Sequence, residues 1–257
     1  MEWDLSTADF PARTAQEEDE AEAELVADRL LEEPLVEIQE GALQSRPELL
    51  ILAYSPESCA LLQHAFQEQE IIGTVIFSDE DLTGNCLAPS LSDKSAFVRS
   101  AGNGVLTIQC QYEVQEERAN AWTKAVFSKL EPKRVLVVGK LKVDDLKGGI
   151  DPFADPVLYG WTTSHAVSSN SSSVEKLPRG NLIRGLPAAL MLRSEISGIP
   201  GYALVDFESP AGPSSKSIQR LASALSEICV PMGAKIQPVG KEHILPSVAR
   251  AQGPLFV

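Results

Sequence analysis

The sequence lacks any long apolar run, and none of its apolar stretches approaches the roughly 18 residues that a membrane-spanning helix requires. It also lacks the basic segment followed by an apolar one with which a secretory signal peptide begins, because residues 1–30 are acidic. We therefore expect a protein that neither crosses a membrane nor is secreted. We therefore expect the protein in the cytoplasm and also in the nucleus.

Cysteine is scarce and its spacing is uninformative. The four cysteines are Cys59, Cys86, Cys110 and Cys229, with no C-x-x-C pair and no interleaved histidine. Local spacing therefore builds neither a structural zinc site nor a thioredoxin-type redox site. Reduced and mostly buried thiols are the expectation.

Motifs of catalysis are missing as well. The sequence contains no G-x-x-x-x-G-K-[ST], no G-x-S-x-G and no H-E-x-x-H. Its one G-x-G, at Gly102 to Gly104, precedes an apolar run instead of following one, which predicts a hairpin turn and not a phosphate loop. We expect neither catalysis nor a cofactor nor a metal.

A few residues of chemical interest remain, but each is isolated. His64, His165 and His243 lie far apart in the sequence. The pair Asp144-Asp145 follows an apolar strand, at the end where α/β folds place their ligands. A solvated acidic turn is the alternative for this pair.

Basic residues are too few for a nucleic-acid-binding surface. The chain has 22 Lys and Arg against 36 Asp and Glu, a net charge of -14. Residues 1–40 hold fourteen of the acids and only two arginines, so the other 217 residues sum to -2. Neither part offers phosphate a basic surface. The acidic segment at residues 1–44 predicts a disordered arm, and an arm that contacts a basic partner is the alternative.

What the sequence has is enough apolar side chain, 44% of 257 residues, to bury one large core. Leu49 to Tyr54 is an apolar run of the kind buried on both faces of a sheet, and Lys133 to Leu141 (KRVLVVGKL) is the clearest central strand. Ser55 and Pro56 start a helix that reaches about residue 69. Further strands are expected at 75–78, 97–99, 105–112 and 202–207, and further helices at 116–130, 187–197 and 214–229.

This alternation predicts an α/β fold, a single three-layer α/β/α sandwich domain with a mixed, mainly parallel sheet over residues 45–252. Residues 144–180 are rich in glycine, proline and serine and predict a long flexible loop. Residues 253–257 are left as a short tail.

Residues 181–201 (NLIRGLPAALMLRSEISGIPG) carry a family resemblance. With Leu186-Pro187-Ala188-Ala189 followed at the same separation by Ile199-Pro200, they resemble a segment of the proteasome assembly chaperone 1 family. The order of the other elements is also similar to that family. The resemblance implies a chaperone of 20S proteasome assembly that pairs with the related proteasome assembly chaperone 2, promotes formation of the α-ring from α subunits and prevents misassembly.

The C-terminus adds to this resemblance. Chaperones of this kind end in a hydrophobic residue, a tyrosine and any residue, and insert that tail between α subunits, with the terminal carboxylate on a lysine. Leu255, Phe256 and Val257 match these positions, with phenylalanine in place of tyrosine. The ring retains its apolar burial but loses a hydroxyl. Pro254 restricts the tail, so it has less entropy to lose on docking.

Two alternatives to this interpretation are kept. The terminus could be a frayed apolar end that packs on its own domain. The domain could instead be a small-molecule enzyme of nucleoside-phosphorylase or hydrolase type, because this α/β architecture hosts such enzymes, although fold alone is a weak argument for function.

Overall fold

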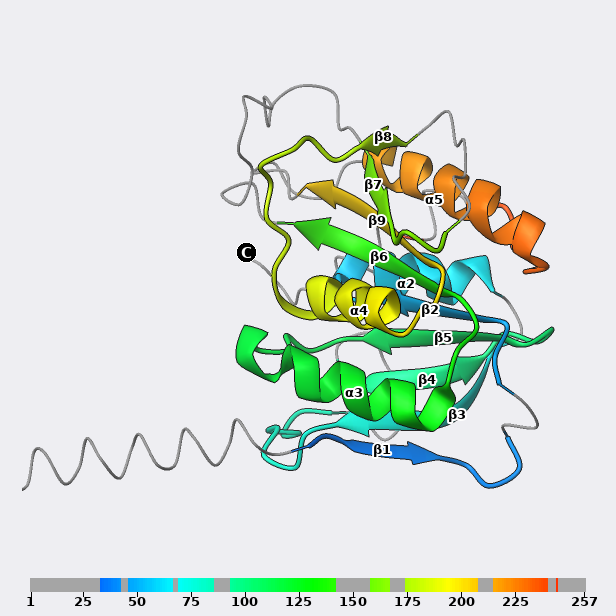
Figure 1. The fold of residues 1–257 in the computed structure, drawn as a ribbon. Helices are drawn as coiled ribbons and strands as arrows, with labels where there is room; N and C mark the ends of the chain where they lie inside the picture. The colour runs from blue at the N-terminus through cyan, green and yellow to red at the C-terminus, as the bar shows by residue number, and fades with distance from the viewer. Residues whose placement is uncertain are drawn as a thin grey trace, which may run out of the picture. The chain divides into compact units, whose positions relative to one another are not determined.

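A computed structural model of the chain describes residues 33–42, 46–66, 69–85, 93–141, 158–166, 174–207, 215–239 and 244. They build a nine-stranded sheet with helices on both faces (Figure 1). The strands are β1 (Leu35–Ile38), β2 (Leu49–Ala53), β3 (Glu70–Ile76), β4 (Ala96–Ser100), β5 (Val105–Cys110), β6 (Val135–Leu141), β7 (Tyr159–Thr162), β8 (Glu175–Lys176) and β9 (Gly201–Phe207). The helices are α2 (Pro56–Ala65), α3 (Ala119–Leu130), α4 (Gly185–Ile196) and α5 (Ser215–Cys229), with the 3-10 turns η1 (Glu116–Arg118) and η3 (Val230–Met232).

The strand order is β1-β3-β4-β5-β2-β6-β9-β7-β8. Neighbouring strands are parallel from β5 through β2 and β6 to β9. Antiparallel strands extend this centre on both sides. All five residues of β2 are buried, which explains why its sequence is an uninterrupted apolar run. The predicted mixed sheet is confirmed, with β6 inside it.

Two helical layers cover the sheet (Figure 1). Helices α3 and α4 pack on one face, around the fully buried Trp122, and the core on the opposite face contains α2 and α5. The three-layer sandwich that the alternation predicts is therefore confirmed. Among the described residues, no helix has the length and apolar character needed to span a bilayer.

The turn between β4 and β5 confirms the hairpin. Gly102, Asn103 and Gly104 all have positive φ, of 75°, 52° and 73°. Glycine adopts this left-handed region without steric cost and asparagine tolerates it. The G-x-G therefore closes a hairpin and does not cradle a phosphate.

The sheet begins earlier than the predicted boundary at residue 45. Strand β1 pairs antiparallel with β3, with Val36 opposite Val75 and Ile38 opposite Gly73. The close approach requires glycine, because a Cβ on Gly73 would lie 2.2 Å from the carbonyl oxygen of Glu37. A strand of only four residues among acidic neighbours gave too weak a pattern to predict. Residues 1–32 of the predicted arm lie outside the described residues.

The prediction of one long loop at residues 144–180 is wrong in part. Strand β7 pairs antiparallel with β9, and β8 adds two residues beside β7. Both strands are too short to show the two-residue periodicity by which a strand is predicted. They also lie in a segment rich in glycine, proline and serine. Residues 142–157 and 167–173 lie outside the described residues.

Candidate functional site

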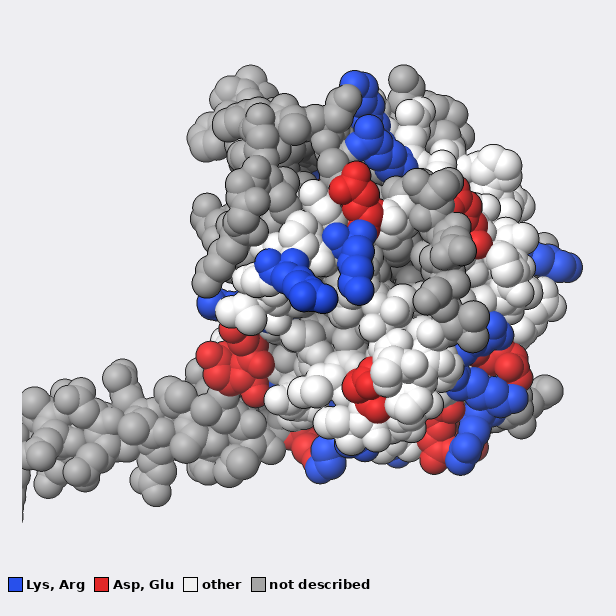
Figure 2. Space-filling view, turned by 45° about the horizontal axis from the view of Figure 1, so that its top comes forward, with Lys and Arg blue, Asp and Glu red and all other residues white. Residues whose placement is uncertain are grey.

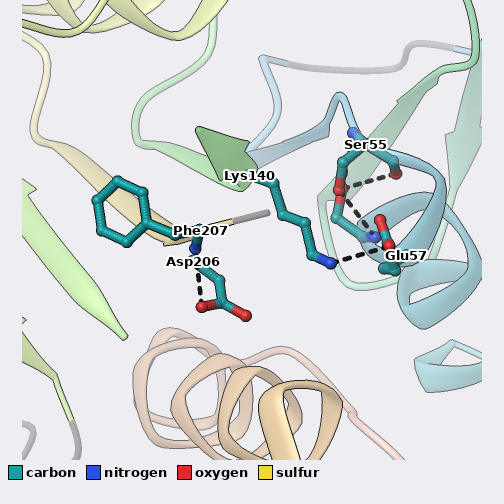
Figure 3. Close-up of polar contacts among 6 residues, drawn as sticks. Ser55, Glu57, Lys140, Asp206 and Phe207 are labelled. Atoms are coloured by element: carbon teal, nitrogen blue, oxygen red, sulfur yellow. Dashed lines mark hydrogen bonds and ion pairs between the residues drawn. The ribbon is translucent and has the colours of Figure 1, made fainter. Parts of the chain in front are cut away.

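Charged side chains meet at the carboxyl ends of the central parallel strands, where α/β folds place their ligands. The chain leaves β2 at Ala53 and enters α2 through a reciprocal cap. The Ser58 amide donates to the Ser55 hydroxyl over 3.3 Å, and the Ser55 amide donates to the Ser58 hydroxyl over 3.0 Å. This cap places Glu57 in the first turn of α2, over the end of the sheet (Figure 3).

A buried ion pair joins this helix to the sheet. Lys140, the penultimate residue of β6, donates from Nζ to the Oε1 atom of Glu57 over 2.9 Å. Only 6% of the Lys140 side chain and 7% of the Glu57 side chain is exposed. Such a pair is costly to break, because removal of one partner leaves the other charge buried and uncompensated.

A second carboxylate lies beside the pair. Asp206 of β9 is opposite Lys140 in the parallel register, and it is 3% exposed. Its Oδ1 atom accepts a hydrogen bond from the Phe207 amide over 2.8 Å, whereas Oδ2 has no hydrogen-bond partner. Burial raises the pKa of Asp206, and the Phe207 hydrogen bond and the Lys140 charge oppose that shift. We call Glu57, Lys140 and Asp206 the strand-end cluster.

The strand-end cluster supplies charge but no activated nucleophile. The Ser55 and Ser58 hydroxyls lie 2.9 Å apart and bond each other and the helix backbone, and no described histidine bonds to either of them. The nearby Cys59 thiol donates to the carbonyl oxygens of Ala53 and Cys110. Burial raises the Cys59 pKa well above its usual value, so the reactive thiolate is disfavoured. A nucleophile needs a base within hydrogen-bond reach, and none of the described residues supplies one to these hydroxyls or to the Cys59 thiol.

The other thiols are equally unreactive. Burial raises the pKa of Cys110 and that of Cys229 to about 12. These two and Cys59 are free and buried, as the sequence predicts, while Cys86 lies outside the described residues. Among the residues that the structure describes, no group of three or more His, Cys, Asp or Glu side chains could hold a metal ion.

A second ion pair, partly buried, lies on the α3 side of the sheet and was not predicted from the sequence. Arg118 of η1 forms two hydrogen bonds with the Asp79 carboxylate, of 2.7 and 3.1 Å, and its guanidinium lies 3.5 Å from the centre of the Phe77 ring. The nearby Trp122 indole donates to the Tyr112 hydroxyl over 3.0 Å. Arginine favours such bidentate and stacked geometry, so these contacts fix η1 and α3 against the sheet.

A groove of about 840 Å³ lies elsewhere, between α2, α5 and the segment 230–239. Its lining is mostly apolar and includes the half-exposed Val230, and the described residues that line it include no histidine, cysteine, lysine or arginine.

Of the residues singled out in the sequence as possible site residues, the structure describes only His64 and His165, and these two lie on different elements. His64 lies in the last turn of α2 and His165 in the turn after β7. His243, Asp144-Asp145 and the tail residues Leu255, Phe256 and Val257 lie outside the described residues. The strand-end cluster was missed because its three charges are distant in sequence and only the parallel register makes them neighbours. The helix-start signal at Ser55-Pro56 was the only sequence feature that pointed to this region.

Comparison with known proteins finds similar folds but no similar sequences. No family model and no curated protein matches the sequence. Among solved structures, the chain is similar to PbaB from Pyrococcus furiosus, an archaeal proteasome activator, with a TM-score of 0.57 at 12% identity over 86% of this chain and 96% of that one. It is similar to PbaA from the same organism, an archaeal homolog of proteasome-assembly chaperone, with a TM-score of 0.57 at 13% identity over 86% and 90%. It is also similar to a protein of unknown function from Thermoplasma acidophilum, with a TM-score of 0.59 at 9% identity over 91% of this chain and 93% of that one. The chain thus has the α/β fold of these proteins.

Proposed function

We propose that this protein is a chaperone of 20S proteasome assembly that acts without catalysis. The observation that carries the proposal is the fold, which is shared over 86% of the chain with a homolog of proteasome-assembly chaperone. The segment at residues 181–201, which resembles the same family, forms the approach to α4, the whole of that helix and the entry to β9. Among the described residues near the strand-end cluster, no hydroxyl or thiol has a base within hydrogen-bond reach, which speaks against the enzyme alternative.

In this proposal the protein pairs with a related chaperone and holds α subunits while their ring forms, in the cytoplasm and the nucleus. It would act by stabilising subunit interfaces that are still incomplete and by covering surfaces that could otherwise pair wrongly. Leu255, Phe256 and Val257 are the proposed docking tail. A C-terminal carboxylate with one or two side-chain pockets is an established mode of peptide recognition.

The test measures the affinity of the full-length protein for assembled α-rings. Deletion of residues 255–257 should weaken binding, and Phe256→Ala should weaken it about ten- to a hundredfold, because it removes one apolar anchor. Phe256→Tyr should hold or tighten binding if the pocket accepts a hydroxyl.

The control is pairing with the partner chaperone, which the tail variants should leave unchanged. If no variant changes α-ring affinity, the tail is not the docking element. If the unaltered protein binds neither α-rings nor a second chaperone, the proposed function itself is wrong.

A further inference from the structure

Residues 176–193 stand out in this acidic protein because they contain four cations and no acid. The cations are Lys176, Arg179, Arg184 and Arg193, and all four are exposed. Glu175 and Glu195 flank the segment in sequence, and Glu116 of η1 lies near Gly185. Glu195 is held by hydrogen bonds from the amide and hydroxyl of Ser164. Figure 2 shows lysine and arginine side chains gathered in the upper half of this face, with few acidic ones among them.

These four cations form no ion pair with another described residue. Exposed cations elsewhere commonly do, as in the pairs of Arg46 with Glu131, Lys124 with Glu33 and Lys133 with Glu48. Their charges are therefore available to a partner.

Exposed apolar side chains accompany the cations. Leu182, Leu192 and Ile196 are 57%, 56% and 70% exposed, and they are half of the six large apolar side chains that are exposed in the described part of the chain. Leu192 and Ile196 are four residues apart in α4 and so share one side of the helix.

The fold turns these side chains outward together. Leu177 and Ile183 pack inward on Leu141, Tyr159 and Val205, which fixes the segment between β8 and α4 on the sheet. Leu186 and Leu190 then anchor the inner side of α4 in the core. The cations and the exposed apolar residues occupy the remaining outward positions.

We propose that the outer surface of residues 176–196 is a docking surface for a protein segment that carries both carboxylates and apolar side chains. Arginine beside apolar residues is the composition of interface centres, and unpaired cations complement carboxylates. A nucleic acid would not use the exposed leucines, and the net charge of -14 repels both nucleic acid and anionic membranes. The proposal does not depend on the proteasome.

The test titrates a fluorescein-labelled peptide rich in glutamate and leucine into the full-length protein and follows anisotropy at low salt. The double variant Arg184→Glu with Arg193→Glu should weaken binding about tenfold, because each change replaces attraction by repulsion. The control, Lys129→Glu with Lys235→Glu, makes the same change in net charge at exposed positions of α3 and the C-terminal segment, and should change affinity less than about twofold. Circular dichroism of both double variants checks that they are folded.

Three further probes separate the alternatives. The matched peptide with glutamine in place of glutamate should bind more weakly, and Leu192→Ser should reduce binding of the acidic peptide. An absence of saturable binding, or equal losses in the two double variants, would overturn the proposal. So would tighter binding of single-stranded DNA or of phosphatidylserine vesicles than of the peptide.

Discussion

At the scale of single residues, the buried charge of Lys140 should contribute more to the stability of the fold than charges on the surface do. Lys140 is the cation that faces both Glu57 and Asp206, at a depth where less than a tenth of each side chain is exposed. Surface pairs such as Lys133 with Glu48 have roughly half of each side chain in water. The two kinds of pair should therefore respond very differently to the loss of the cation.

We expect Lys140→Met to lower the free energy of unfolding by about 3 to 5 kcal/mol, because it leaves two carboxylates buried without a cation. Lys133→Met, the matched control, should lower it by about 1 kcal/mol or less. Urea denaturation of both variants measures the difference. Equal effects would show that the strand-end cluster is hydrated and not buried.

Asp206 gives a second prediction, in the pH dependence. Its folded-state pKa is raised above the unfolded value, so its contribution to stability is fully present below the unfolded pKa and is lost as pH rises through the folded pKa. Asp206→Asn retains the oxygen that accepts from Phe207 but cannot ionise. The stability of this variant relative to the unaltered protein should increase from about pH 4 to pH 7. Denaturation at a series of pH values checks the sign, and a decrease would contradict it.

At the scale of elements, the sheet edge at β1 depends on close contact with β3. An added methyl group at Gly73 would collide with the Glu37 carbonyl of β1. Gly73→Ala should therefore displace β1 and destabilise the protein by about 1 to 3 kcal/mol.

Hydrogen exchange locates this effect. Amides of residues 35–38 should exchange faster in Gly73→Ala, while β2 and β6 keep their protection. Thr74→Ala is the control in the same strand, because it removes atoms instead of adding them. Unchanged protection of β1 in Gly73→Ala would show that the strand can shift to accept the methyl group.

At the scale of the whole molecule, the described domain begins at Glu33, after the acidic segment of residues 1–32. Removal of residues 1–32 should change the melting temperature little, because this segment lacks apolar periodicity and carries much of the negative charge. Removal of residues 1–40 should lower it by several degrees, since each kcal/mol corresponds to about 2 to 4 °C for a domain of this size and β1 would be lost.

Differential scanning calorimetry of the two truncations distinguishes a boundary at residue 33 from one near 45. Equal melting temperatures would mean that β1 contributes nothing to stability. A large loss on removal of residues 1–32 would mean that the arm packs on the domain.

The sequence by itself determined the elements whose local signals are strong. Apolar runs at residues 49–53 and 135–139 predicted β2 and β6, because the buried positions of a strand covered on both faces favour apolar residues. The serine and proline before α2 gave a helix start, and glycines gave the hairpin turn, because their backbone preferences act within a few residues. Alternation of such elements was enough for the three-layer sandwich.

Only the tertiary structure decided which residues meet. Strands β1, β7 and β8 are too short to show a period, and they are ordered by pairing with distant strands. Glu57, Lys140 and Asp206 come from three elements, and no local pattern marks them because their contact depends on the parallel register. The outward cations and leucines of residues 176–196 are ordinary in sequence. They become a surface because Leu177 and Ile183 are fixed inward by the core.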